Sequence, residues 1–344
     1  MINRITQKEI AKHMNVSIST VSKALKDSHE IGEELRHKIQ DYAKQNNYFP
    51  NPIALNLRNK SSQTIALILP EIVHHFFSSV IKGIEEVAHE KGYNLIISLS
   101  QDSLDLEAQN VFNLIQKNID GFILCLSKET QWNNAISHIQ EAIDSGIPVV
   151  LFDRVSDAID CDKVISNDYE SAVDVTNKLL AAGRKKIGLI TTQDFISVGT
   201  LRTKGYEDAL KKANIEVLSS RILKVLKVSN SNEEIKHFIA HSDVDAIIGV
   251  NETFTAQALI HLKDKGKNIP NDVSLVAFSD GVLSTFTSPK LTALDQQGLK
   301  MGKASATLLI NRLEAMAKKR ELPKFKTEII ETKWVERDST KKLF

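Results

Sequence analysis

The first fifty residues place apolar positions at the spacing of short amphipathic helices. Thr6 and Glu9 have the Ser/Thr-x-x-Glu spacing of a capping box, which predicts that a helix begins at Thr6. Ile10, Ala11 and Met14 then fall on one face of this helix. We therefore expect a short helix with a buried apolar face close to the N-terminus.

A second helix is predicted directly after the first. Ser17 is a good N-cap, and Val21, Ala24 and Leu25 recur behind it at helical spacing. Two short helices joined by a tight turn form a helix-turn-helix signature. A third amphipathic segment, residues 33–46, would close a three-helix core through Leu35, Ile39, Tyr42 and Ala43.

The second predicted helix carries positions that this core does not need. A recognition helix presents its N-terminal residues to base edges in the major groove, so Ile18 and Ser19 are candidate base contacts. Lys23 is a candidate for a guanine or a phosphate. The further DNA-binding candidates are Thr6, Ser17, Thr20 and Ser22. The alternative is a helical hairpin with a polar, solvated face.

A short segment that starts with a proline follows this unit. Asn51 is an N-cap for a predicted helix over residues 52–58, in which Ala54 and Leu57 share one face. Seven residues are too few for a stable isolated helix, so this segment orders only when something packs on it. A linker with an incidental leucine is the alternative. Polar residues 60–64 then mark a domain boundary.

From residue 65 the pattern changes to short apolar runs that alternate with amphipathic helical segments. This alternation predicts two doubly wound α/β halves with buried parallel strands. The predicted strands cover residues 65–69, 95–99, 122–126 and 149–152, and then 187–191, 222–228, 246–250 and 275–278. Helices between the first four strands are expected near residues 78–91, 104–117 and 132–145.

Polar and aromatic side chains follow these strands, at the position where open α/β sheets bind their ligands. Flat apolar rings suit the C–H face of a sugar, and planar bidentate groups suit vicinal hydroxyls. Structural roles are the alternative: the phenylalanines as core residues, and Asp153 as an ion-pair partner of Arg154. The candidates are His74, Phe76, Phe77, Asp153, Arg154, Arg202, Asn251, Ser279 and Asp280.

Composition and charge add one asymmetry to this picture. The 344 residues are 42% hydrophobic with a net charge of +1, as in ordinary soluble proteins. Residues 1–60 carry ten Lys/Arg and six Asp/Glu, whereas residues 61–344 carry 34 and 37. A basic front ahead of an acidic body fits a phosphate-contacting domain with a separate control domain, and a solvated surface is the simpler alternative.

Several classes of protein are not supported by the sequence. Cys125 and Cys161 form neither a disulfide framework nor a zinc pair, and His74-His75 has no further ligand at metal spacing. No apolar run reaches the ~18 residues of a membrane span, and the start does not read as a signal peptide, so a cytoplasmic protein is expected. Without a dinucleotide, Walker or nucleophile-elbow motif, we expect no cofactor and no enzyme activity.

The runs Ile5–Leu25 and Tyr48–Arg58 resemble the N-terminus of the LacI/GalR family of bacterial transcription regulators. The resemblance implies that Ile18, Ser19 and Lys23 occupy base-reading positions. The family often has Arg where Lys23 stands, and a lysine lacks the planar fork of bidentate guanine recognition.

The same resemblance gives the hinge segment a role. In the family, two copies of this helix pair across a dimer while lying in the DNA minor groove. Leu57 aligns with the residue that wedges between central base pairs, and Ala54 and Arg58 of the same predicted helix are further candidate DNA contacts.

The body resembles the effector domain of this family and the periplasmic ribose- and galactose-type sugar-binding proteins. The resemblance implies that Phe76 and Phe77 stack on the ligand. Two departures stand out: His74-His75 replaces a frequent Asn-Pro, and Ser279 stands where many members carry a ligand-binding Asp. Either Asp280 substitutes for that Asp or the contact is weaker. Ligand hydroxyls are expected to bind Asp153, Arg154, Arg202, Asn251 and Gln296.

The expected architecture is an all-α helix-turn-helix DNA-binding domain followed by an α/β periplasmic-binding-protein-like domain of two doubly wound subdomains. The DNA-binding domain covers residues 1–50, the hinge 51–62 and the effector-binding and dimerisation domain 63–344. Within the last, the N-subdomain is expected at about 63–165 plus 296–324, and the C-subdomain at about 166–295 plus 325–344.

The expected function is that of a sequence-specific DNA-binding transcription regulator, a repressor whose operator affinity is controlled by a small sugar or sugar derivative. Its expected partners are a palindromic double-stranded operator, this effector and a second copy of the chain. The alternative is a carbohydrate-binding protein of the solute-binding type without a DNA role.

Overall fold

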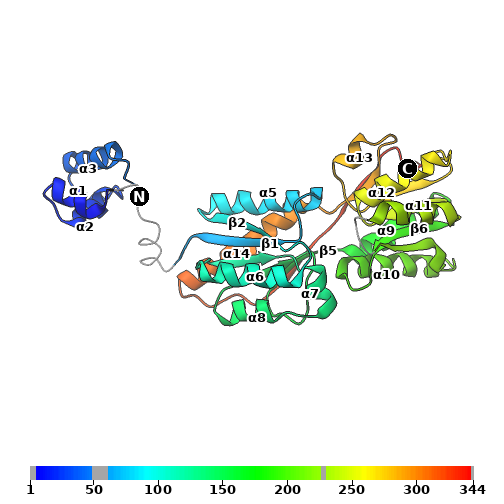
Figure 1. Cartoon of the computed structure of the whole chain (residues 1–344), viewed down its shortest axis with the longest axis horizontal. Coiled ribbons are helices and arrows are strands. Elements are labelled where there is room, and N and C mark those ends of the chain that lie inside the picture. The colour runs from blue at the N-terminus through cyan, green and yellow to red at the C-terminus, as the bar shows by residue number, and fades with distance from the viewer. Residues whose placement is uncertain (1–4, 49–60, 226–229, 342–344) are drawn as a thin grey trace. The chain divides into compact units, whose positions relative to one another are not determined.

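A computed structural model describes residues 5–48, 61–225 and 230–341 of the chain. The chain divides into two compact units, residues 1–62 and 63–344. Each unit has a hydrophobic core of its own, so each is described by itself (Figure 1). Among the described residues, no helix is long and apolar enough to cross a membrane.

The first unit is a three-helix core whose helix starts follow the sequence. The predicted capping box is present: the Thr6 hydroxyl accepts from the Glu9 N–H at 3.3 Å, and the Glu9 carboxylate accepts from the Thr6 N–H at 2.7 Å. Ser17 caps the next helix by accepting from the Thr20 N–H at 3.0 Å. The helices are α1 (Gln7–His13), α2 (Ile18–Ala24) and α3 (Glu33–Gln45), and their buried side chains are Ile10, Ala11, Val21, Ala24, Ile39 and Ala43.

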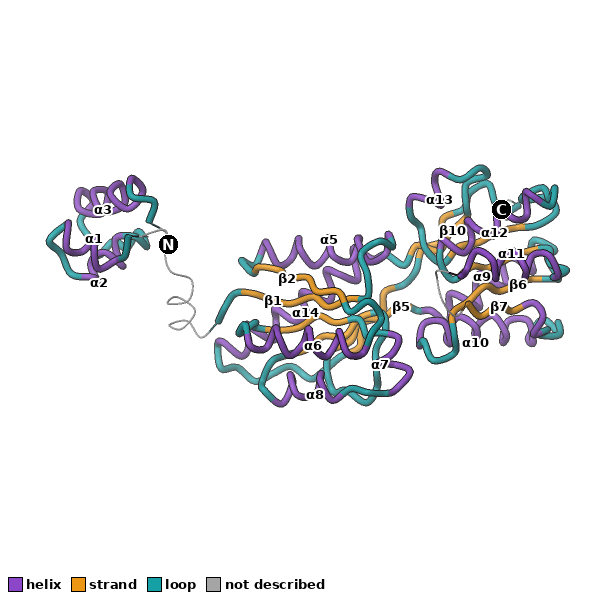
Figure 2. Tube along the Cα trace, in the orientation of Figure 1, coloured by secondary structure: helices purple, strands orange, loops and turns teal. Residues whose placement is uncertain are grey.

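The second unit contains two six-stranded sheets flanked by helices (Figure 2). The first sheet has the order β11-β5-β4-β3-β1-β2, and all its strands pair in parallel. Its strands are β1 (Thr64–Leu69), β2 (Asn94–Leu99), β3 (Gly121–Leu124), β4 (Val149–Phe152), β5 (Asp162–Ser166) and β11 (Thr327–Ile330).

Helices cover both faces of this first sheet, since successive side chains of a strand point to opposite faces. The odd-numbered apolar side chains of β1 belong to one core cluster with α5 and α14, and the even-numbered ones to another with α6 and α8. The helices are α5 (His75–Glu90), α6 (Leu104–Gln116), α7 (Lys128–Asn133), α8 (Ser137–Asp144) and α14 (Gly298–Ala317).

The second sheet has the order β12-β10-β9-β8-β6-β7, in which only the short edge strand β12 runs antiparallel among the described pairs. Its strands are β6 (Ile187–Thr192), β7 (Ile222–Val225), β8 (Ala246–Gly249), β9 (Ser274–Ala277), β10 (Thr292–Asp295) and β12 (Lys333–Val335). Its helices are α9 (Asp168–Ala181), α10 (Ser197–Lys212), the 3-10 turn η1 (Ser219–Arg221), α11 (Ser231–His241), α12 (Glu252–Asp264) and α13 (Val282–Phe286).

All eight predicted strands are present, whereas β5, β10, β11 and β12 were not predicted. Two further details differ from the sequence analysis. The helix expected near residues 132–145 is two helices, because Asn134 adopts a left-handed conformation (φ 49°) that ends α7. The expected subdomain boundary between residues 324 and 325 is wrong, because β11 pairs in parallel with β5 of the first sheet. β11 is a half-exposed edge strand without a continuous apolar run, so the hydrophobic pattern gives no sign of it.

Three chain crossings therefore join the subdomains: from β5 to α9, from β10 to α14 and from β11 to β12. The first subdomain comprises the first sheet with its helices, and the second subdomain the second sheet with its helices.

The contact between α5 and α14 requires a residue without a side chain at Gly302. A Cβ atom there would lie 2.1 Å from the Val80 carbonyl oxygen. We predict that Gly302→Ala lowers the free energy of unfolding by about 1–3 kcal/mol, the usual cost of overpacking, in urea titrations of the full chain. Thr307→Ala, at an exposed position of the same helix, is the control. Equal stability of the two variants would contradict the prediction.

Candidate nucleic-acid surface and ligand cavity

The exposed face of α2 carries the residues that the sequence proposed for base contacts. Ile18 is 49% exposed although it is apolar, and Ser19 and Lys23 are also exposed. Val21 and Ala24, on the opposite face, are fully buried in the three-helix core. Packing of this buried face holds α2 against the other two helices and leaves its N-terminal turn exposed to solvent, as a recognition helix requires.

Several hydroxyls on this surface already have intramolecular partners. The Ser17 hydroxyl lies 2.7 Å from the Ser19 hydroxyl and 2.8 Å from the Thr20 hydroxyl, and the Thr6 hydroxyl donates to Glu9 at 2.9 Å. Thr20 and Ser22 are half-buried. Capping therefore accounts for Thr6 and Ser17 without DNA.

Lys23 forms an ion pair with Glu30 on the loop that follows α2. Both side chains are largely exposed, so this pair contributes little to stability and yields readily to a stronger partner. The predicted minor-groove residues Ala54, Leu57 and Arg58 lie outside the described residues.

A cavity lies between the two sheets of the second unit, at the carboxyl ends of their strands. Water centres can occupy about 110 Å³ of it, well above the roughly 10–15 Å³ that a single water needs, so the cavity has room for a small ligand. Nine of the ten predicted ligand residues line it: His74, Phe76, Phe77, Asp153, Arg154, Arg202, Asn251, Ser279 and Gln296.

The tenth candidate, Asp280, does not line this cavity. Its carboxylate pairs with Arg337, at 2.7 Å and 2.9 Å from the two terminal guanidinium nitrogens. Ser279 contributes to the cavity wall instead. Asp280 thus lies beside the cavity rather than in its wall, and Arg337 of the C-terminal segment holds its carboxylate there.

Asp153 sits at the end of β4 with a left-handed backbone (φ 57°), a conformation that Asp tolerates better than most residues. Its side chain is buried, and the Cys125 thiol donates to its carboxylate at 3.8 Å. Burial raises the pKa of Asp153 to about 6, and the nearby Arg154 opposes this rise. The carboxylate is thus a buried acceptor in the cavity wall, with Arg154 and Arg202 nearby.

Arg154 and Lys128 share one carboxylate beside the cavity. Asp102 accepts from Arg154 at 2.5 Å and pairs with Lys128 at 2.8 Å. These two cations hold the pKa of Asp102 below its ordinary value despite burial. The pairing fixes both cationic side chains in the cavity wall.

Arg202 of α10 is held from the opposite side of the cavity. Its guanidinium donates to Asp168 at 2.7 Å and to the Val250 carbonyl at 2.8 Å, and it lies 4.7 Å from the centre of the Phe278 ring. Asn251 follows β8 and caps α12 by accepting from the Phe254 N–H at 2.8 Å. Both polar groups are therefore positioned before any ligand arrives.

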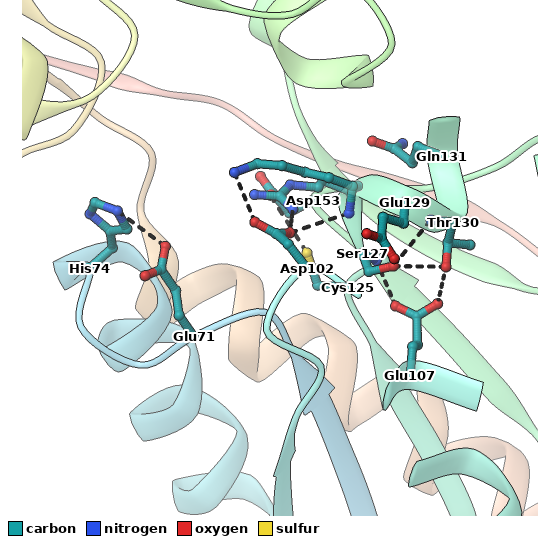
Figure 3. A network of polar contacts seen from close by, with 12 residues as sticks. Glu71, His74, Asp102, Glu107, Cys125, Ser127, Glu129, Thr130, Gln131 and Asp153 are labelled. Carbon is teal, nitrogen blue, oxygen red and sulfur yellow. Dashed lines mark hydrogen bonds and ion pairs between the residues drawn. The ribbon is translucent and has the colours of Figure 1, made fainter. Parts of the chain in front are cut away.

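Glu71 and His74 form a pair at the cavity that the sequence analysis did not predict. The His74 Nε2 lies 3.1 Å from the Glu71 carboxylate. Figure 3 shows these two side chains turned toward each other. This hydrogen bond raises the pKa of His74 and lowers the pKa of Glu71. Glu71 follows the last residue of β1 by two positions, so a search for polar residues directly after each strand would have found it.

Other lining residues were also missed. Lys128 and Thr192 follow or end β3 and β6, where the same rule applies. The apolar lining residues cannot be told from core residues by their sequence alone. The full set is Glu71, Lys128, Thr192, Ile196, Val198, Gly199, Val250 and Phe254. Within the part of the chain that the structure describes, no group of three His, Cys, Asp or Glu is placed to hold a metal.

A helix-turn-helix unit joined to a two-sheet α/β domain with a polar cavity defines a class: DNA-binding regulators with a periplasmic-binding-protein-like ligand domain. Comparison with known families agrees. Residues 6–51 match the bacterial regulatory proteins of the lacI family, and residues 62–333 match the periplasmic binding proteins and sugar binding domain of the LacI family. The chain belongs to the LacI family and is a transcription regulator.

Individual relatives and structures are similar along nearly the whole chain. The transcriptional regulator RegA of Clostridium saccharobutylicum is 29% identical, over 97% of this chain and 98% of its own. Catabolite control protein A of Priestia megaterium is 28% identical, over 89% and 91%. A lac repressor dimer bound to operator shares the fold, with 20% identity, a TM-score of 0.84 and coverage of 98% and 99%.

The raised pKa of Asp153 makes stability depend on pH. Between about pH 4 and pH 6 the folded chain binds more protons at this site than the unfolded chain, so stability falls as pH rises through this window and is flat above it. Asp153→Asn removes the effect. We predict that the difference in unfolding free energy between the Asp153→Asn variant and the unmodified chain shifts by roughly 3 kcal/mol in favour of the variant from pH 4 to pH 7. Parallel urea-unfolding profiles would contradict this, and exposed Asp160→Asn is the control.

Proposed function

We propose that this regulator is a repressor whose affinity for a palindromic operator is set by an uncharged sugar bound in the cavity. The observation that carries the proposal is the composition of the cavity wall. It combines two aromatic rings, of Phe76 and Phe77, with planar hydrogen-bonding groups fixed on both subdomains. Carbohydrate recognition requires aromatic rings that stack on the C–H faces of the sugar and planar bidentate groups that bind its vicinal hydroxyls.

The charges of the wall favour an uncharged ligand over a sugar phosphate. The three wall cations each have a carboxylate partner: Asp102 for Lys128 and Arg154, and Asp168 for Arg202. Glu71 and Asp153 add negative charge to the wall itself. A doubly charged phosphate would therefore compete with existing ion pairs and face two further carboxylates.

Structures of similar fold lend support through their ligands. A CelR regulator was solved with cellobiose, at 20% identity and a TM-score of 0.72. A LacI-family regulator of Enterococcus faecium was solved with ribose, at 22% identity and a TM-score of 0.69. Both ligands are uncharged sugars.

Control of DNA binding is proposed to act between two copies of the chain. The side chains of α13 form an exposed apolar surface, with Phe286 83% and Val282 59% exposed, which fits a contact with a second copy. A ligand that alters the two subdomains alters how two such copies place their helix-turn-helix units. Typical allosteric coupling changes DNA affinity about 5- to 150-fold.

The ligand proposal is tested by thermal shift of the full chain with ribose, glucose, cellobiose and glucose 6-phosphate. We expect an uncharged sugar to stabilise the chain, by about 2.7 kcal/mol at 100 times its Kd, and Phe76→Ala to weaken its binding about three- to tenfold. Phe112→Ala, at an exposed aromatic residue of α6, is the control. Stabilisation by the sugar phosphate alone would contradict the charge argument.

The DNA proposal is tested by selection of random duplexes with the full chain, in which we expect an inverted repeat. Lys23→Ala should relax base preference at one symmetric pair of positions, at a cost of about 1–3 kcal/mol in binding. Lys26→Ala, an exposed lysine just beyond α2, should weaken all sequences alike. Selection of duplexes without symmetry would refute the dimeric operator.

A further inference from the structure

The short helix α7 of the first subdomain lies beside the cavity and contacts the second subdomain. Its first residue, Lys128, lines the cavity, and its last turn contains Gln131 and Trp132. These two side chains contact the start of α10 and the residues just before it, where Ile196 and Val198 also line the cavity. Both sides of this contact thus lie within a few residues of the ligand space.

The contact itself consists of one aromatic pair and a set of hydrogen bonds. The rings of Trp132 and Phe195 meet edge to face, with centroids 4.4 Å apart and planes at 87°. The Gln131 amide donates to the Ser197 hydroxyl at 2.9 Å and to the Val155 carbonyl at 3.2 Å. Its oxygen accepts from the Ser197 N–H at 3.3 Å.

This last bond supplies a helix cap that the local sequence lacks. The N-cap position of α10 is Ile196, whose apolar side chain makes no capping hydrogen bond. The first N–H groups of a helix need an acceptor, and here Gln131 of the other subdomain provides one. The start of α10 is therefore better satisfied when the subdomains are in this arrangement than when they separate.

The other side of α7 is anchored to the first subdomain. The fully buried Glu107 carboxylate accepts from the Ser127 N–H at 2.5 Å and from the Thr130 hydroxyl at 2.7 Å. Figure 3 shows Gln131 on the side of α7 away from Glu107. Because these bonds hold α7 to the first subdomain, α7 does not move with the second subdomain, and a shift of the second subdomain would break its contact with Gln131 and Trp132.

We propose that the contact of Gln131 and Trp132 with Phe195 and Ser197 is a latch that holds the two subdomains in the arrangement that completes the cavity. The latch lowers the population of arrangements in which Lys128 and Ile196 no longer face one ligand. Its effect on ligand affinity rests on the proposed function, because a ligand that needs both walls binds only the latched fraction. The contact itself does not depend on that function.

The first experiment needs no ligand. The chain has two tryptophans, so Trp334→Phe leaves Trp132 as the only one. Trp132 is 64% exposed and meets Phe195 edge to face, so in this full-length background we expect Phe195→Ala to change the emission intensity of Trp132 and Phe112→Ala to leave it unchanged. Gln131→Ala and Phe195→Ala should each lower the urea midpoint, and the double variant should lower it by less than the sum of the two. Unchanged emission together with additive midpoints overturns the latch.

The second experiment measures ribose and cellobiose binding by calorimetry. We expect Phe195→Ala and Gln131→Ala to weaken binding about three- to tenfold and Phe195→Tyr, which keeps an aromatic ring, to restore it. Unchanged affinity in both alanine variants overturns the link between latch and cavity. If neither sugar binds the unmodified chain, the ligand proposal fails, while the fluorescence result still decides whether the latch exists.

Discussion

The facing carboxyl ends of two parallel sheets are the constraint on which the rest of this structure depends. Parallel strands place their last residues at one edge, so side chains from β1, β3, β4, β6 and β8 reach the same cavity although they are far apart in the chain. Helix cores on both sheet faces hold these edges in place. The polar wall needs this support, because Arg154 and Arg202 are buried and tolerable only with fixed carboxylate partners.

Hydrophobic periodicity was sufficient for strands formed by longer apolar runs, and it failed at β5, β10, β11 and β12, each of which has only two apolar residues. The β4 strand, four apolar residues buried on both faces, was predicted with its observed bounds. The β11 strand alternates exposed and half-exposed positions and was missed. Local capping chemistry was equally readable, as Thr6 and Ser17 show, because both donor and acceptor lie within three residues.

The cavity was predicted to the extent that its residues follow predicted strands. Asp153 and Arg154 were found in this way, whereas the position of Asp280 was not, because its partner Arg337 lies 57 residues further along the chain. The roles of Asp102 and Gln131 were also beyond the sequence. Asp102 reaches across 52 residues to Arg154, and Gln131 reaches across 66 to Ser197. Such pairings exist only once the sheets have formed.

The three crossings between the sheets limit how such a protein can be rearranged. The first subdomain takes β11 from a segment that follows nearly all of the second subdomain, so neither subdomain is a continuous stretch of the gene. One recombination event between two relatives cannot exchange a single half of the ligand domain. Such an event would combine the edge strand β11 of one parent with the remaining strands of the first sheet from the other. The helix-turn-helix unit, by contrast, is continuous in sequence and can be exchanged by a single recombination event.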